Sequence, residues 1–142
     1  MAETLLEVRN LHVQFDTYDG VAEVINGVDF TLNRGETAAL VGETGCGKSV
    51  TVKSIMGLLP AAEITAGEII YKGQDLLELS DAERHARRGR EISMIMQDPM
   101  TSLNPVFEIG NQISEVLEVH TDMNRDERKK RVLELLLEVG IS

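Results

Sequence analysis

Tryptophan is absent from this chain of 142 residues, and three phenylalanines and two tyrosines supply its only aromatic rings. Proteins that hold single-stranded nucleic acid stack the bases on such rings, so the composition disfavours that class of function. Basic side chains are also few: 14 Lys and Arg stand against 24 Asp and Glu, and the formal net charge is −10. Because phosphate backbones are held by clustered cations, we expect no nucleic-acid partner.

Cysteine and long apolar runs are equally scarce. The single Cys46 cannot form an internal disulfide, which suits a reducing compartment. No apolar run approaches the ~20 residues of a membrane-spanning helix, and the first residues lack the pattern of a secretion signal. A hydrophobic share of 42% is enough to build a buried core, and the length suits one domain.

The first part of the chain has the two-residue period of antiparallel β-structure. Residues 11–15 and 21–25 are predicted strands, joined by a hairpin turn at the Asp-Gly of 19–20. The Asn-Gly of 26–27 predicts a further turn, after which residues 28–32 alternate again. The opening is therefore expected to be an antiparallel β layer.

The pattern then changes to strands alternating with helices. Residues 37–41 are a nearly continuous apolar run, as expected of a strand buried on both faces, and residues 91–96 are a second such candidate. A helix is predicted to follow residue 47 and to run to about residue 59, where Pro60 stops it. A further strand is expected at residues 67–71.

Capping residues predict the remaining helices. Ser80 and Glu83 form a capping box that opens a short helix, and Asn124 with Glu127 opens a last helix that runs to Gly140. The chain is predicted to be helical from about residue 108. The apolar face of the last helix is wide enough to need a partner. The basic clusters at 84–90 and 125–131 are interpreted as solvated helix faces.

Residues 42–49 match the phosphate-binding P-loop pattern Gly-x-x-x-x-Gly-Lys-Ser at every fixed position. The glycines let backbone N–H groups point at the β-phosphate, and the helix that follows adds the positive end of its dipole. Lys48 is expected to reach the β- and γ-phosphates, and the Ser49 hydroxyl is expected to ligate Mg²⁺. The residues predicted to surround the nucleotide are Gly42, Glu43, Thr44, Gly45, Cys46, Gly47, Lys48, Ser49 and Val50.

Cys46 occupies a variable position of this loop. It is interpreted either as a small tolerated residue or as a reactive thiol, because a thiol at a helix N-terminus can be activated. The second interpretation predicts that a thiol reagent blocks nucleotide binding and that MgATP protects Cys46.

The segment after the second predicted buried strand has two interpretations. Asp98 could hold magnesium, as in a compact kinase or GTPase-like enzyme, or Gln97 could be the functional group. Residues 96–105, Met-Gln-Asp-Pro-Met-Thr-Ser-Leu-Asn-Pro, resemble the Q-loop of ABC-transporter ATPases, in particular the branch that serves dipeptide, oligopeptide and nickel importers. Residues 42–50, 55–60 and 67–69 also resemble this branch, and they do so at the same spacings.

This resemblance implies an α/β fold: a P-loop NTPase core with an N-terminal antiparallel β subdomain, over residues 1–100, and the start of a helical subdomain, over residues 101–142. It implies ATP and Mg²⁺ as cofactors, with Lys48 and Gln97 as catalytic groups and Gln97 next to the metal or the attacking water. Residues 99–107 would lie near the permease subunits in the membrane. A second ATP-binding subunit would complete a head-to-tail dimer on the cytoplasmic face of the cell membrane.

The family also stacks an aromatic ring on adenine, and both Phe15 and Tyr18 are candidates. Phe15 shares the apolar face of Leu11 and Val13, which fits a core residue equally well, whereas Tyr18 lies off that face. Val50 departs from the broader family pattern, which often has threonine there, but resembles the peptide branch.

Three family elements are missing from the sequence: the signature loop, an apolar strand that ends in Asp-Glu, and a switch histidine. We therefore expect an N-terminal fragment of an ATPase subunit for an importer, of peptides in view of the branch, that binds ATP without turnover. Two alternatives stay open: the compact enzyme that uses Asp98, and a module that senses ATP and never hydrolyses it.

Overall fold

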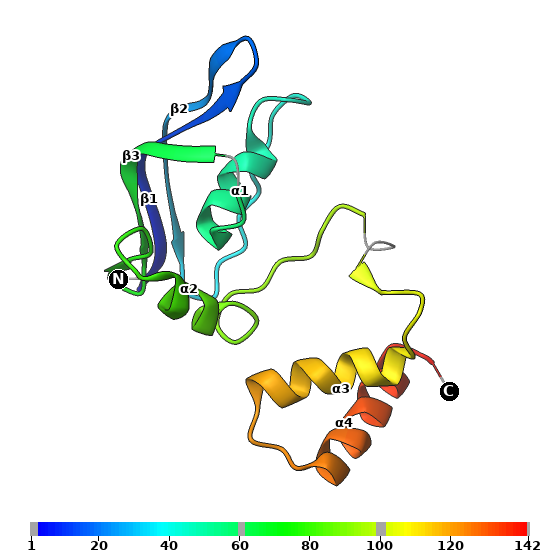
Figure 1. Ribbon diagram of the computed structural model, residues 1–142. Helices are drawn as coiled ribbons and strands as arrows, with labels where there is room; N and C mark the ends of the chain where they lie inside the picture. The colour runs from blue at the N-terminus through cyan, green and yellow to red at the C-terminus, as the bar shows by residue number, and fades with distance from the viewer. Residues whose placement is uncertain (1–2, 60–61, 99–101, 142) are drawn as a thin grey trace. The chain divides into compact units, whose positions relative to one another are not determined.

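The computed structural model describes residues 3–59, 62–98 and 102–141. The chain divides into two compact units, Met1–Arg88 and Gly89–Ser142. The first unit combines an antiparallel sheet with helices α1 and α2, and the second contains helices α3 and α4 (Figure 1).

The sheet has the strand order β2-β1-β3-β4, and every pair is antiparallel. The long strands β1 (Thr4–Thr17) and β2 (Gly20–Asn33) form the predicted hairpin, and β3 (Ala62–Tyr71) covers the other edge of β1, followed by the short β4 (Gln74–Asp75). Alternate side chains of these strands form the buried core, namely Leu6, Val8, Leu11, Val13, Ile25, Ile69 and Tyr71. The predicted antiparallel opening is thus present.

The turn predicted at residues 26–27 is wrong, because β2 continues through it. Leu11 pairs with Val28 and His12 pairs with Asn26, so Gly27 is an extra residue on β2. Its φ of 77° is the left-handed backbone of a β-bulge. An Asn-Gly pair supplies that conformation to a turn and to a bulge alike, so the sequence pattern did not separate them.

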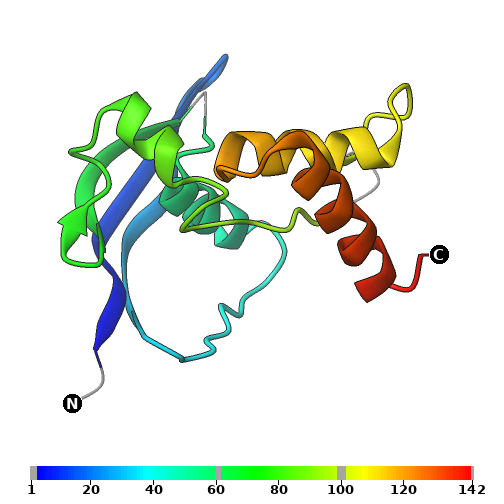
Figure 2. The same ribbon diagram turned by 90° about the horizontal axis from the view of Figure 1, so that it is seen from below.

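Neither predicted buried strand forms. Residues 37–41 and 93–96 have irregular backbone, and Val41 and Ile95 are 87% and 93% exposed. Figure 2 shows residues 34–47 as a long irregular arc between β2 and α1. A strand buried in a parallel sheet needs hydrogen-bonded neighbours, and within the described ranges every strand pair is antiparallel. Without such a neighbour, an apolar run alone does not make a strand.

Helix α1 (Lys48–Met56) packs against β2 (Figure 1) and ends at Gly57, earlier than predicted. Gly57 has a φ of 61°, the left-handed conformation that closes many helices before any proline is reached. Pro60 lies outside the described residues. Helix α2 (Asp81–Arg87) begins at the predicted capping box, in which the backbone N–H of Ser80 donates to the Glu83 carboxylate at 2.9 Å.

The second unit is a helical hairpin of α3 (Ile109–His120) and α4 (Arg125–Glu138). The predicted capping box at Asn124 starts α4, and Gly140 closes it in the double hydrogen-bond pattern of a Schellman motif. The apolar face of α4 is partly uncovered: Val132 is buried, but Leu133 and Leu137 are about two thirds exposed. In the part of the chain that the structure describes, no helix combines the length and the hydropathy needed to cross a membrane.

Candidate functional site

The P-loop joins the irregular arc to α1. Gly47 determines how closely this loop approaches strand β2. Gly47 is buried and has a φ of 94°. A Cβ atom built there would overlap Cδ1 of Ile25 and lie 3.2 Å from the carbonyl oxygen of Val24. Only glycine allows the loop to approach β2 this closely in this backbone conformation. The first turn of α1 is thereby held against the sheet.

Lys48 points back into the loop. Its Nζ donates to the carbonyl oxygens of Gly42 and Glu43 at 2.7 and 2.6 Å, and it lies 3.5 Å from Sγ of Cys46. The cation is therefore held by the backbone oxygens of the first two residues of the loop. The oxygens of a phosphate group share its negative charge and would compete favourably with these neutral acceptors.

A small cavity opens at this point. Its volume is about 150 Å³, and its lining consists of Val24, Gly45, Gly47, Lys48, Ser49 and Val50. Pockets that enclose a whole ligand usually measure about 300–1,000 Å³. The cavity thus fits phosphate groups, while a base and ribose would lie outside it. Glu43 and Thr44 form the exposed rim of the loop.

The lining also fits magnesium bound through phosphate. Ser49 contributes an exposed hydroxyl next to Lys48. Among the residues described, no group of three or more His, Cys, Asp or Glu side chains gathers as a metal site. Mg²⁺ commonly takes few protein ligands and completes its shell with phosphate oxygens and water. One exposed hydroxyl beside the small cavity is compatible with such an environment.

The two aromatic candidates differ in accessibility. Tyr18 lies in the turn between β1 and β2, and its side chain is fully exposed. Phe15 is half-buried within β1, where it pairs with Ala22 of β2 and Ala62 of β3. Phe15 is therefore a partly buried residue of the sheet, whereas the Tyr18 ring is accessible to a ligand. Which of them stacks on adenine stays a prediction.

Gln97 belongs to the second unit, at a bend in the irregular segment that precedes α3. Gln97 and Asp98 are both exposed. The role of Gln97 beside the metal stays a prediction. Of the segment expected to face permease subunits, residues 99–101 lie outside the described residues. Beyond them, Val106 and Phe107 are 82% and 61% exposed.

One cation contradicts the interpretation of residues 84–90 as a solvated face. Arg88 is half-buried, and its guanidinium donates from Nε to the carbonyl oxygen of Met56 at 2.8 Å and from Nη2 to that of Gly57 at 2.9 Å. It thus touches the end of α1, the helix that begins in the P-loop. The sequence contains no local signal for this contact, because the partners are backbone atoms about thirty residues away.

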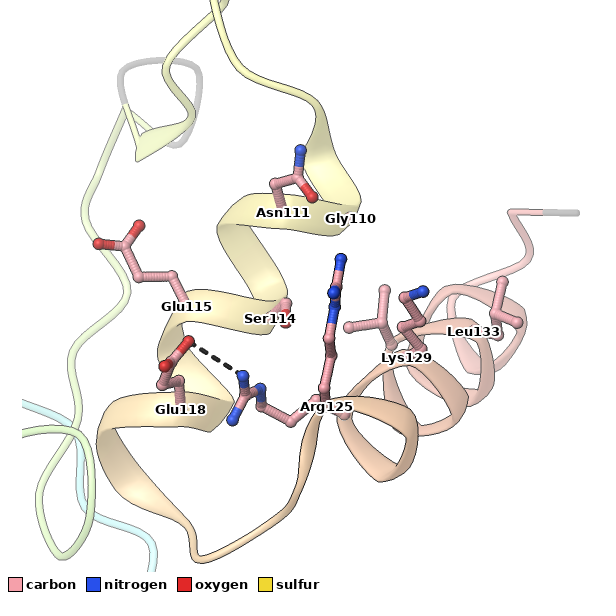
Figure 3. A pocket seen from close by; sticks show the side chains of 10 residues that line it. Gly110, Asn111, Ser114, Glu115, Glu118, Arg125, Lys129 and Leu133 are labelled. Atoms are coloured by element: carbon pink, nitrogen blue, oxygen red, sulfur yellow. Dashed lines mark ion pairs between the residues drawn. The ribbon is translucent and has the colours of Figure 1, made fainter.

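A larger pocket, of about 550 Å³, lies between α3 and α4 (Figure 3). Ser114 on α3 faces Arg125 and Lys129 on α4 across it, and an ion pair of 3.2 Å joins Glu118 to Arg128. This pocket contains none of the residues predicted to bind nucleotide. It reflects the open packing of the helical hairpin.

The ABC transporter family model matches residues 25–142. The chain is 52% identical to the dipeptide transport ATP-binding protein DppD of Bacillus subtilis, over 98% of this chain and 42% of that protein. It is 51% identical to the oligopeptide transport ATP-binding protein OppD of the same organism, over 96% of this chain and 39% of that protein. The chain thus spans about two fifths of the length of these relatives.

Solved structures show the same fold. The dimeric post-hydrolysis state of the ATP-binding cassette MJ0796, bound to ADP and Pi, superposes with a TM-score of 0.82 at 22% identity, over 97% of this chain and 58% of that one. The predicted fold class, a P-loop α/β core with an antiparallel β subdomain, is confirmed by this likeness. With the family match and the identities to DppD and OppD, it establishes that the chain belongs to the ABC transporter family.

Proposed function

We propose that residues 42–49 bind the triphosphate of ATP together with Mg²⁺, and that the chain is part of an ATP-binding subunit of a peptide importer. The position of Lys48 supports binding of the triphosphate, because its ammonium lies inside the loop and lines the cavity. The names of the relatives, dipeptide and oligopeptide transport ATP-binding proteins, support the second.

Each group of the loop has a separate task. The backbone N–H groups and the N-terminal end of α1 attract the phosphates. Lys48 exchanges its two carbonyl contacts for oxygens of the β- and γ-phosphates, and the Ser49 hydroxyl completes the shell of Mg²⁺. Because most of this binding comes from the backbone, a chain with a net charge of −10 can still hold a triphosphate.

In the whole protein, we propose ATP hydrolysis coupled to solute uptake. Gln97 orders the metal or the attacking water, a second ATP-binding subunit completes the site, and permease subunits contact the region after Gln97. The protein then works as a peripheral subunit at the cytoplasmic face of the membrane. The sequence contains neither a signature loop nor a strand ending in Asp-Glu, so these 142 residues alone are proposed to bind ATP without turning it over.

Titration calorimetry with MgATP on the chain tests this function. Wild type is expected to bind, and Lys48→Ala is expected to lose at least about tenfold in affinity, since it removes the cation nearest the phosphates. Lys53→Ala is the matched control, because it removes the same charge from the other end of α1. Equal affinities of wild type and Lys48→Ala contradict the site. Phosphate release by the chain that depends on Lys48 contradicts binding without turnover.

A further inference from the structure

Helix α1 is held at both of its ends. Its N-terminal end is held where Gly47 meets Ile25. The buried side chains of α1 are Thr51, Ser54 and Met56, of which the first two are small and polar and the third is the last residue of the helix. The hydroxyl of Thr51 donates to the carbonyl oxygen of Gly47, the residue that caps α1, and the hydroxyl of Ser54 donates to that of Val50. Apart from its last residue, α1 therefore buries only small polar side chains.

The C-terminal end is held by Arg88. The backbone N–H groups of Gly57 and Leu58 satisfy the carbonyl oxygens of Ser54 and Lys53. The carbonyl oxygens of Met56 and Gly57 instead receive the two hydrogen bonds of Arg88, at 2.8 and 2.9 Å. The guanidinium is a fixed fork of donors with a full charge, and it lies at the negative end of the helix dipole.

The guanidinium lies close against the backbone at this end. A Cβ atom at Gly57 would lie only 2.9 Å from Nη2 of Arg88. Arg88 itself directly follows α2, whose start is fixed by the capping box at Ser80. The contact thus connects a well-capped helix to the end of α1.

We propose that Arg88 is a positioning residue for nucleotide binding: it fixes the axial position of α1 and thereby the position of Lys48 and Ser49 in the phosphate site. A helix of nine residues is roughly 13 Å long and transmits a shift of one end to the other. Misplacement of binding groups by a fraction of an ångström to 1 Å weakens an interaction steeply. This inference rests on the proposed function of the loop.

The test compares Arg88→Gln, Arg88→Lys and Arg87→Gln in the chain. Arg87 is the matched control, because it carries the same charge at the neighbouring position and donates to the side chain of Gln74 instead of α1. The affinity for MgATP is measured by calorimetry. The rate at which Cys46 reacts with a disulfide reagent, without nucleotide, reports the conformation of the loop, since Cys46 is the only cysteine. Far-UV circular dichroism and thermal melting measure folding.

Arg88→Gln is expected to bind MgATP about tenfold more weakly and to change the Cys46 rate at temperatures where the variant is folded. The affinity and the Cys46 rate of Arg88→Lys are expected to lie between those of Arg88→Gln and wild type, because an ammonium keeps the charge but cannot donate in the two-pronged geometry of the guanidinium. Arg87→Gln is expected to match wild type. If Arg88→Gln retains the wild-type affinity and Cys46 rate, the inference is overturned.

Two further outcomes are possible: Arg88→Gln does not fold, or wild type does not bind nucleotide. If Arg88→Gln does not fold, Arg88→Lys decides, and an affinity and Cys46 rate equal to wild type overturn the inference. If wild type binds no nucleotide, the proposed function fails. The Cys46 rates of the same variants then still show whether Arg88 positions the loop, and unchanged rates overturn that as well.

Discussion

The backbone of Gly47 lies against the side chain of Ile25, so closely that a Cβ atom at position 47 would overlap Cδ1 of Ile25. Gly47→Ala must therefore displace either the loop or the side chain of Ile25. It also places a side chain on a backbone with a φ of 94°, which costs about 1–2 kcal/mol by itself. We expect the affinity for MgATP to fall by tenfold or more, roughly, as measured by calorimetry.

Two variants separate the clash from the backbone strain. Gly45 has a φ of 88°, but nothing lies within 4 Å of a Cβ built there, so Gly45→Ala is expected to show the smaller effect of strain alone. Ile25→Val removes the overlapping Cδ1 atom and should restore part of the affinity in the Gly47→Ala background. A loss at position 45 as large as at position 47 contradicts the role of Ile25.

The thiol of Cys46 is exposed and lies 3.5 Å from Nζ of Lys48. Bound phosphate would cover it, so MgATP is expected to slow its reaction with a thiol reagent. At a nucleotide concentration of ten times Kd, mass action predicts a rate about tenfold lower. The Lys48→Ala variant, with an affinity at least about tenfold lower, should show at most about twofold protection at the same concentration. Equal wild-type rates with and without MgATP contradict the placement of Cys46 in the site.

How far sequence reasoning succeeded depended on the range of the interactions involved. The helix starts at Ser80 and Asn124 follow from side chains within three residues of each other, and both were predicted. The glycine and lysine positions of the P-loop are equally local. The strand predicted at residues 37–41 does not form, because a buried strand depends on the strands beside it and not on its own sequence alone. Arg88 was missed for the same reason, since its partners are backbone oxygens of another helix.

The capping box of α2 should depend on pH. Hydrogen bonds from the Ser80 side chain, and then from its backbone N–H, hold the pKa of Glu83 below its ordinary value. Because the pKa is lower in the folded chain, the stabilisation is fully present above the unfolded pKa and is lost as the pH falls through the folded one. Below that pH, the first turn of α2 is expected to fray, which amide hydrogen exchange would detect.

Ser80→Ala tests whether the hydrogen bond from the Ser80 side chain lowers the pKa of Glu83. An NMR titration of the Glu83 carboxyl carbon should show its pKa move up towards the ordinary value, because the largest contribution is removed. Arg87→Gln is a graded control, since the charge of Arg87 lowers the same pKa by the smallest of the contributions. A larger shift in Arg87→Gln than in Ser80→Ala would mean that charge, and not the cap, controls Glu83.

Tyr18 and Phe15 make opposite predictions for adenine binding. Tyr18 is fully exposed at the hairpin turn, whereas Phe15 is half-buried in the central strand β1. If Tyr18 stacks on the base, Tyr18→Ala should weaken ATP binding by about five- to a hundredfold and leave the binding of inorganic tripolyphosphate unchanged. Phe15→Ala should lower the melting temperature, because it removes packing from the sheet. The comparison with tripolyphosphate is decisive, since it isolates the contribution of the base from that of the loop. A selective loss of ATP affinity in Phe15→Ala, with none in Tyr18→Ala, assigns the stacking ring to Phe15 instead.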